Sequence, residues 1–147
     1  MTIQKILAAF DFSEPAGRTV RWAHQLAKST GATLEVVHVH PDLYDGRSTP
    51  ALGLPWPSEG QEERYMRFLE QEVKTAVAAL VEPLDANIPL HIVRGDPVKR
   101  TLAVAEQISA DLVCVGSTGK GGVQRVLLGS VSESIVRSSP VPVLIVH

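Results

Sequence analysis

The sequence lacks the features of secreted, membrane-spanning and nucleic-acid-binding proteins. It has one cysteine, Cys114, so no disulfide can form within the chain, and a reducing cytoplasm suits it. We expect no signal peptide, because the start has no basic segment followed by a long apolar run, and no membrane span, because no apolar run approaches about 18 residues. Fourteen basic and 16 acidic residues give a net charge of −2, which argues against a general attraction to nucleic acid.

The best-known catalytic motifs are absent as well. The chain has no Walker A sequence, no G-x-G-x-x-G, no G-x-S-x-G and no C-x-x-C. His38 and His40 alternate along a strand and could share a metal, but no third ligand follows at zinc spacing, so we expect no metal site. Nothing in the sequence alone places a general base or any other catalytic residue.

Apolar segments that read as strands alternate with segments of helical periodicity, which indicates an α/β fold with a parallel sheet covered on both faces. We expect one domain over residues 1–147. The strands are predicted at residues 3–10, 33–40, 88–93, 112–115 and 143–146, and the helices at 14–30, 59–81, 97–109 and 130–138. Residues 41–60 are rich in proline and glycine and read as an irregular connection, in which Tyr44 and Trp56 either fold back onto the body or contact a partner.

The stretch from Asp111 to Ser134 has the parts of a phosphate site. An apolar strand ends at Gly116, a glycine-rich loop follows, and Gly129-Ser130 opens a short helix. Glycines let the backbone approach phosphate oxygens, and a helix start offers unpaired N–H donors. A glycine loop with no ligand explains the same spacing.

The pattern G-x2-G-x9-G-[ST], followed by Val131-Ser132-Glu133, resembles the ATP-binding signature of the universal stress proteins. The strand ending in Asp11-Phe12-Ser13, the Gly95-Asp96-Pro97 turn and the final apolar strand resemble that family too, so the likeness spans the whole chain. It implies a Rossmann-like open sheet of five parallel strands in the order 3-2-1-4-5, with Asp11 and Gly116 facing one crevice.

The resemblance also implies an adenine-nucleotide site, with ATP as cofactor, either alone or with Mg. In it Asp11 contacts the nucleoside, Val39 offers backbone groups to the adenine, and the loop and helix start hold the phosphates. The alternative interpretation of Asp11 is a helix-entry or turn carboxylate. The candidate nucleotide-binding residues are Ala9, Asp11, Ser13, Val39, Val115, Gly116, Ser117, Gly119, Gly129, Ser130, Val131 and Ser132. Lys120 and Arg125 are either phosphate cations or solvated surface charges.

We therefore expect a cytoplasmic ATP-binding regulator of the stress response, with slow hydrolysis at most. Bound phosphates would order residues 117–128 and change a surface that an unidentified protein partner reads. Two alternatives remain: an enzyme that hydrolyses ATP or transfers a nucleotidyl or phosphoryl group, and a nucleotide-free structural dimer module. In each case we expect a homodimer through the C-terminal strand, residues 141–146, because exposed sheet edges tend to pair.

Overall fold

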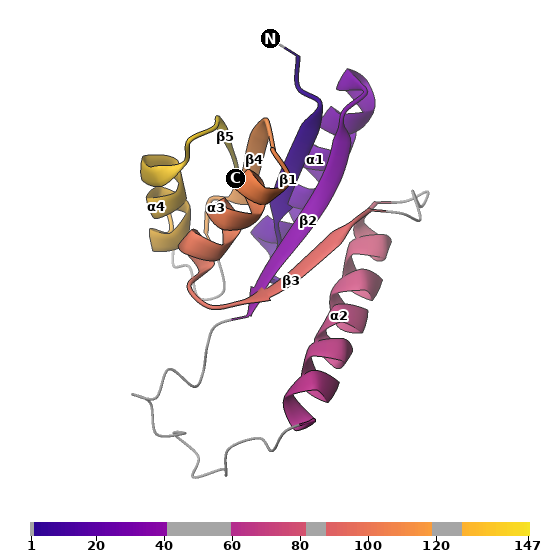
Figure 1. Cartoon of the computed structure of the whole chain (residues 1–147). Coiled ribbons are helices and arrows are strands. Elements are labelled where there is room, and N and C mark those ends of the chain that lie inside the picture. The colour runs from indigo at the N-terminus through magenta and orange to yellow at the C-terminus, as the bar shows by residue number, and fades with distance from the viewer. Residues whose placement is uncertain (1, 41–59, 82–87, 119–127) are drawn as a thin grey trace.

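The fold is built on a five-stranded parallel sheet in the order β3-β2-β1-β4-β5 (Figure 1). The computed structural model describes residues 2–40, 60–81, 88–118 and 128–147. The strands are β1 (Lys5–Ala9), β2 (Thr33–His40), β3 (Leu90–Arg94), β4 (Leu112–Gly116) and β5 (Val143–Val146). The predicted strand order is therefore confirmed, and β1 and β4 lie side by side with Ile6 opposite Leu112.

Four helices lie between the strands: α1 (Glu14–Thr30), α2 (Gln61–Leu80), α3 (Pro97–Gln107) and α4 (Ser130–Ser138). Local signals set two of the starts. The Ser13 side chain caps α1 by accepting from the Ala16 amide, and the Asp96 carboxylate caps α3 in the same way. Helix α1 ends at Thr30, and the capping residue Gly31 has a φ of 75°, a left-handed conformation that glycine adopts without strain.

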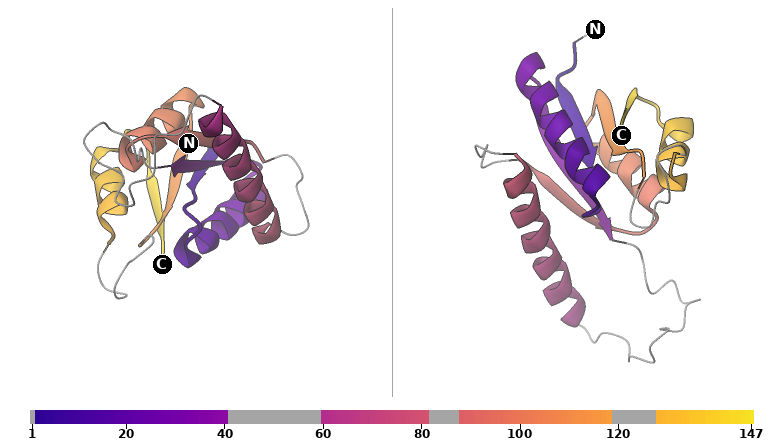
Figure 2. Two further views of the ribbon diagram at one scale, coloured as in Figure 1. Left: turned by 90° about the horizontal axis from the view of Figure 1, so that it is seen from below. Right: turned by 180° about the vertical axis from the view of Figure 1, so that it is seen from behind.

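The helices form a layer on each face of the sheet, as the two views of Figure 2 show. One core cluster joins α1 and α2 to the sheet around Ile6, Val36 and Cys114. The other joins α3 and α4 to the opposite face around Leu7 and Val113. Both faces are covered, which explains why the strands are almost continuously apolar.

The predicted elements are present, and their ends agree with the prediction to within two residues. One expectation about packing is wrong. The helical spacing of apolar residues over 59–81 predicts Tyr65 and Phe68 as core residues, but their exposed fractions are 46% and 59%. The buried stripe of α2 consists of Leu69, Val73 and Val77. Tyr44 and Trp56 lie outside the described residues.

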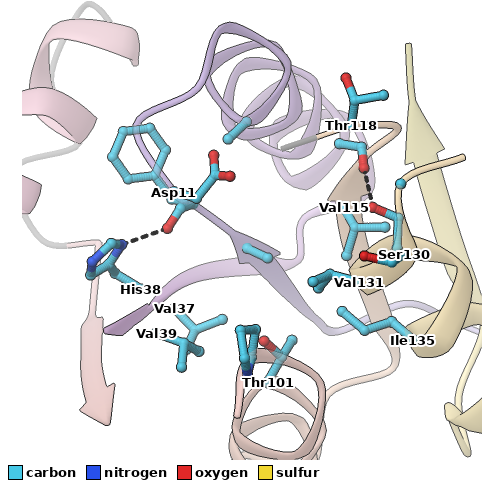
Figure 3. Close-up of a pocket in the computed structure, with 17 residues that line it drawn as sticks. Asp11, Val37, His38, Val39, Thr101, Val115, Thr118, Ser130, Val131 and Ile135 are labelled. Atoms are coloured by element: carbon cyan, nitrogen blue, oxygen red, sulfur yellow. Dashed lines mark hydrogen bonds between the residues drawn. The ribbon is translucent and has the colours of Figure 1, made fainter. Parts of the chain in front are cut away.

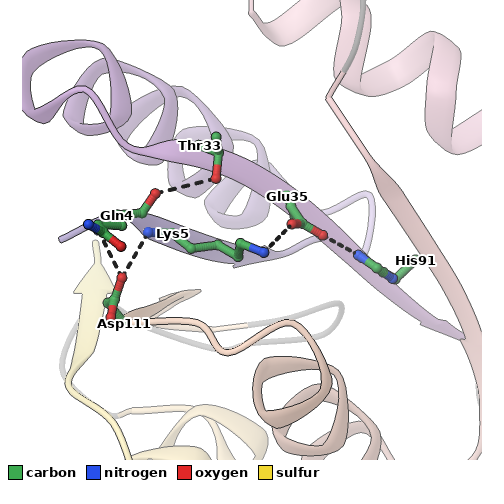
Figure 4. Close-up of polar contacts among 6 residues, drawn as sticks. All are labelled: Gln4, Lys5, Thr33, Glu35, His91 and Asp111. Atoms are coloured by element: carbon green, nitrogen blue, oxygen red, sulfur yellow. Dashed lines mark hydrogen bonds and ion pairs between the residues drawn. The ribbon is translucent and has the colours of Figure 1, made fainter.

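Polar contacts tie the strands together at their amino ends (Figure 4). Asp111 Oδ2 accepts hydrogen bonds from the Gln4 and Lys5 amides at 2.8 and 2.9 Å, and these two donors lower the pKa of the Asp111 carboxyl. Glu35 pairs with Lys5 at 3.4 Å and with His91 Nε2 at 2.6 Å. These groups lie at the opposite end of the strands from Asp11 and Gly116. They therefore link neighbouring strands and take no part in the carboxyl-end surface.

None of the helices described is long and apolar enough to cross a membrane.

Candidate functional site

A pocket of about 530 Å³ opens where the carboxyl ends of β1, β2 and β4 meet the first turns of α3 and α4 (Figure 3). In parallel α/β sheets this edge, at the point where the strand order reverses, is where ligands bind. The pocket is lined by Ala9, Phe10, Asp11, Ala16, Val37, His38, Val39, Pro97, Thr101, Val115, Gly116, Thr118, Gly129, Ser130, Val131, Ser132 and Ile135.

One half of the pocket is apolar. Its walls are Val37 and Val39 from β2, Val115 from β4 and Ile135 from α4. Thr101, in the second turn of α3, adds a hydroxyl to this wall. Such a surface can hold the flat face of an aromatic ring, while the few polar groups around it fix the orientation of the ligand.

Asp11 lies at the end of β1 in a turn that its own carboxylate shapes. Its Oδ1 accepts a hydrogen bond from the Ser13 amide at 3.0 Å. Phe12, between them, has a φ of 65°, which an aromatic residue adopts only at a cost of about 1–3 kcal/mol. The turn therefore holds Asp11 at the pocket and starts α1 at once, with Ser13 as its N-cap.

His38 supports this turn from β2. It is buried, and its Nδ1 donates a 2.7 Å hydrogen bond to the Phe10 carbonyl, which fixes the proton on that nitrogen. The Phe12 ring meets the His38 ring edge-on, with centroids 5.2 Å apart. His40 lies instead against Tyr65, at 5.1 Å. In the described part of the chain no group of three potential metal ligands gathers around either histidine.

Gly116 ends β4 where the strand passes the start of α1. A Cβ atom added at Gly116 would lie 3.1 Å from Pro15 Cβ, 3.2 Å from the Pro15 carbonyl carbon and 3.3 Å from the Ala16 nitrogen. Two of these three atoms are backbone and cannot move aside easily. Gly116 is therefore needed for the close packing of β4 against the start of α1. Gly116 and Ala16, which meet there, form the floor of the pocket.

The first turn of α4, whose N–H groups have no partner within the helix, lies at the pocket. Gly129 is the N-cap and has no side chain to cap them, and Ser130, Val131 and Ser132 line the pocket. Two hydrogen bonds fix this turn to β4: the Ser132 hydroxyl donates to the Gly116 carbonyl at 2.6 Å, and the Gly129 amide donates to the Ser117 carbonyl at 2.7 Å. An uncapped helix start of this kind attracts anions through its donors and its dipole.

The structure brings most of the predicted site residues to this pocket. Those that line it are Ala9, Asp11, Val39, Val115, Gly116, Gly129, Ser130, Val131 and Ser132. Ser13 and Ser117 are not among the lining residues: Ser13 caps α1, and Ser117 is buried and bonded through its backbone to Gly129 and Val146. Gly119, Lys120 and Arg125 lie outside the described residues.

Sequence reasoning missed eight lining residues: Phe10, Ala16, Val37, His38, Pro97, Thr101, Thr118 and Ile135. Pro97 and Thr101 had a usable signal, since they follow the Gly95-Asp96 turn at the carboxyl end of β3. The carboxyl ends of parallel strands share one edge, so the helix that starts there reaches the same pocket.

Comparisons with known proteins agree with this architecture. A universal stress protein of Methanocaldococcus jannaschii, MJ0531, is 32% identical over 146 residues, which cover 97% of this chain and 81% of the relative. The solved structure of the universal stress protein UspA from Lactobacillus plantarum superposes with a TM-score of 0.75 at 25% identity, covering 100% of this chain and 99% of that one.

A further solved structure is that of a universal stress protein in complex with cAMP. It superposes with a TM-score of 0.65 at 26% identity and covers 100% of this chain and 98% of that one. The Universal stress protein family profile itself matches residues 2–147, nearly the full length. The chain is therefore a member of the universal stress protein family.

Proposed function

We propose that this protein binds an adenine nucleotide, ATP, in the pocket between β1, β2, β4 and the start of α4, and that it acts as a nucleotide-dependent regulator in the stress response. One observation carries the proposal: a carboxylate, Asp11, and an uncapped helix start, Gly129–Ser132, line the same pocket around an apolar wall. The nucleotide in the related cAMP complex supports the ligand class.

The pocket has a suitable surface for each part of the ligand. The base would lie in the apolar half, against Val39 and Val115. The ribose hydroxyls would donate to the Asp11 carboxylate, which is the role of an acidic residue in dinucleotide folds. The phosphates would take the N–H groups of the first turn of α4, where the helix dipole favours negative charge.

The same surface is poorly equipped for fast hydrolysis. Of the lining residues that the structure describes, Asp11 is the one carboxylate, and none is lysine or arginine. Phosphoryl transfer needs groups that position the attacking water and neutralise the developing charge. Any Mg²⁺ would come with the triphosphate. We therefore propose a slow turnover, far below about 1 per second, the lower end of typical enzymes.

Binding is tested with a charge change at the helix start. Ser130 is exposed at the first position of α4. Ser130→Glu would stabilise the helix through its dipole but repel phosphate, so ATP affinity should fall at least about tenfold while the unfolding midpoint stays or rises. Ser130→Gln has a similar size without the charge and serves as the control. Isothermal titration with Mg-ATP measures the affinities, and thermal unfolding measures stability.

Three results would contradict the proposal. The first is a wild-type protein that gives no heat with millimolar Mg-ATP, and the second is equal binding by wild type and Ser130→Glu. A turnover above about 1 per second would favour the enzyme over the regulator.

We also propose a homodimer that pairs through β5. This strand is the last in the sheet order, so its outer edge has no partner among the described strands. Exposed edges tend to pair, and a twofold pairing of one strand with itself closes without fibre growth. Light scattering at tens of micromolar should give twice the chain mass of 15.9 kDa, and a monomer would refute it. A cytoplasmic setting, proposed with it, suits the single buried thiol of Cys114.

A further inference from the structure

Thr101 is the one polar side chain that α3 contributes to the apolar half of the pocket. It lies one turn after Pro97, which also lines the pocket, and only 2% of its surface is exposed. Val98 and Leu102, close to it on the helix, are half-buried and pack against the core on this face of the sheet. A valine would fill the same volume in this wall, so the hydroxyl needs an explanation of its own.

The hydroxyl of Thr101 opens into the pocket. It forms no hydrogen bond with any of the residues that the structure describes. Every fully buried side-chain nitrogen or oxygen of the described residues has a hydrogen-bond partner. The Thr101 oxygen has none, so it is not fully buried. The small accessible part of Thr101 therefore includes its oxygen, and that oxygen faces the pocket that the residue lines. Figure 3 places Thr101 beside Val37 and Val39, across the pocket from Asp11 and Thr118.

We infer that Thr101 determines base specificity, by forming a hydrogen bond with N1, N7 or the exocyclic amine of the adenine. The inference rests on the proposed nucleotide site and adds the residue that reads the base. A hydroxyl can donate to a ring nitrogen or accept from the amine. In an apolar wall that excludes water, a ligand that leaves this hydroxyl unpaired loses affinity, so the site rejects it.

The position fits the division of the pocket. Asp11 and the start of α4 offer a carboxylate and N–H groups, which suit the ribose and the phosphates. Thr101 lies beside Val37 and Val39 on the α3 side of the pocket, across from Asp11. A base that lies flat against these walls must point one polar edge toward α3, where the Thr101 hydroxyl is the donor and acceptor at hand.

The test combines a variant with altered bases. Thr101→Val removes the hydroxyl and keeps the shape, and Thr101→Ser keeps the hydroxyl. Titrations use ATP and three analogues. These are 7-deaza-ATP, which lacks N7, 1-deaza-ATP, which lacks N1, and the triphosphate of purine riboside, which lacks the amine. Thr101→Val should bind ATP about fivefold to tenfold more weakly, as for one lost hydrogen bond, and should bind one analogue as tightly as the wild type does. Thr101→Ser should stay within about twofold of wild type for ATP.

Thr19→Val is the matched control. Thr19 is a fully buried threonine on α1, outside the pocket, and its hydroxyl already donates to the Pro15 carbonyl at 2.8 Å. Its replacement should change stability but leave the ranking of the four ligands unchanged.

The inference is overturned if Thr101→Val binds ATP as tightly as wild type, or if it weakens all four ligands by one factor. In both cases the wild type still binds ATP, so the proposed function stands. A wild-type protein that binds none of the four ligands overturns both.

Discussion

The Ser132 hydroxyl donates a 2.6 Å hydrogen bond to the carbonyl of Gly116, and this bond joins the first turn of α4 to the end of β4. The two residues are 16 positions apart in the sequence and enclose the glycine-rich loop. Ser132 is buried, so its hydroxyl holds the helix start in place. The arrangement fixes the donors of α4 beside the floor of the pocket.

Ser132→Ala should destabilise the fold and weaken nucleotide binding together. The change leaves the Gly116 carbonyl without its side-chain donor, which costs about 1–3 kcal/mol of unfolding free energy for a buried group. ATP affinity should fall severalfold, because the helix start loses its fixed position. Urea unfolding and calorimetry measure the two effects. Ser138→Ala, at the exposed last position of α4, is the control and should change neither.

Gly116→Ala should be costly, whereas Gly17, a glycine inside α1, should tolerate alanine. At Gly116 the added Cβ meets backbone of Pro15 and Ala16, so we expect a loss of about 1–3 kcal/mol from overpacking. At Gly17, inside α1, the nearest atom is the flexible Leu80 Cδ2 at 3.3 Å. Gly17→Ala should stabilise by up to about 1 kcal/mol through helix propensity. Equal unfolding free energies for the two variants would contradict this account of Gly116.

Asp11→Asn should reduce the preference for ribose hydroxyls. The amide oxygen can still accept from the Ser13 amide, so the turn is kept, but the second carboxylate oxygen becomes a donor. The ratio of the dissociation constants of 2′-deoxy-ATP and 3′-deoxy-ATP to that of ATP should approach one. ATP itself should bind about tenfold more weakly.

Asp96→Asn is the control for this change. Asp96 caps α3 and does not line the pocket. Asparagine caps helices as well as aspartate does, so the fold should be kept. A ratio that stays at its wild-type value in Asp11→Asn would show that Asp11 serves only the helix entry.

Cys114 should be unreactive in the folded protein. Its side chain is fully buried in β4, and desolvation raises the pKa of the thiol from 9.0 to about 12. The folded state therefore holds the proton more tightly, so this group favours folding below about pH 9, and that contribution declines between pH 9 and 12. Ellman's reagent at pH 8 should label the unfolded chain at once and the native chain only at the rate of opening. Rapid labelling of native protein would contradict this.

Much of the fold could be predicted from local chemistry. Ser13, Gly31 and Asp96-Pro97 set helix ends through interactions within a few residues, so their sequence signals are reliable. The prediction that Tyr65 and Phe68 are core residues is wrong because helical spacing shows which residues share a helix face. It does not show how far the sheet extends beneath that face. The amino-terminal half of α2 reaches past the strands (Figure 1), so its aromatic residues stay exposed.

The site also combines residues that local sequence signals predict with residues that only the three-dimensional structure reveals. Asp11, Gly116 and the Gly129-Ser130 helix start are visible in the sequence because each follows or begins an element. His38 and Thr101 were identified as pocket residues only in the structure. The role of His38 depends on a contact across strands, which no spacing along the chain encodes. The Gly95-Asp96 turn indicates that α3 starts near the pocket, but it does not show that the Thr101 side chain lines it.

The most direct test of the central claim is a titration of ¹⁵N-labelled protein with Mg-ATP, followed by amide chemical shifts. The account predicts that the shifts cluster on Asp11, Thr101 and the amides of Gly129–Ser132. The amides of Lys5 and Glu35, at the opposite end of the strands, should stay in place. Amides that do not move at millimolar Mg-ATP, or shifts that gather at the amino ends of the strands, would contradict nucleotide binding in this pocket.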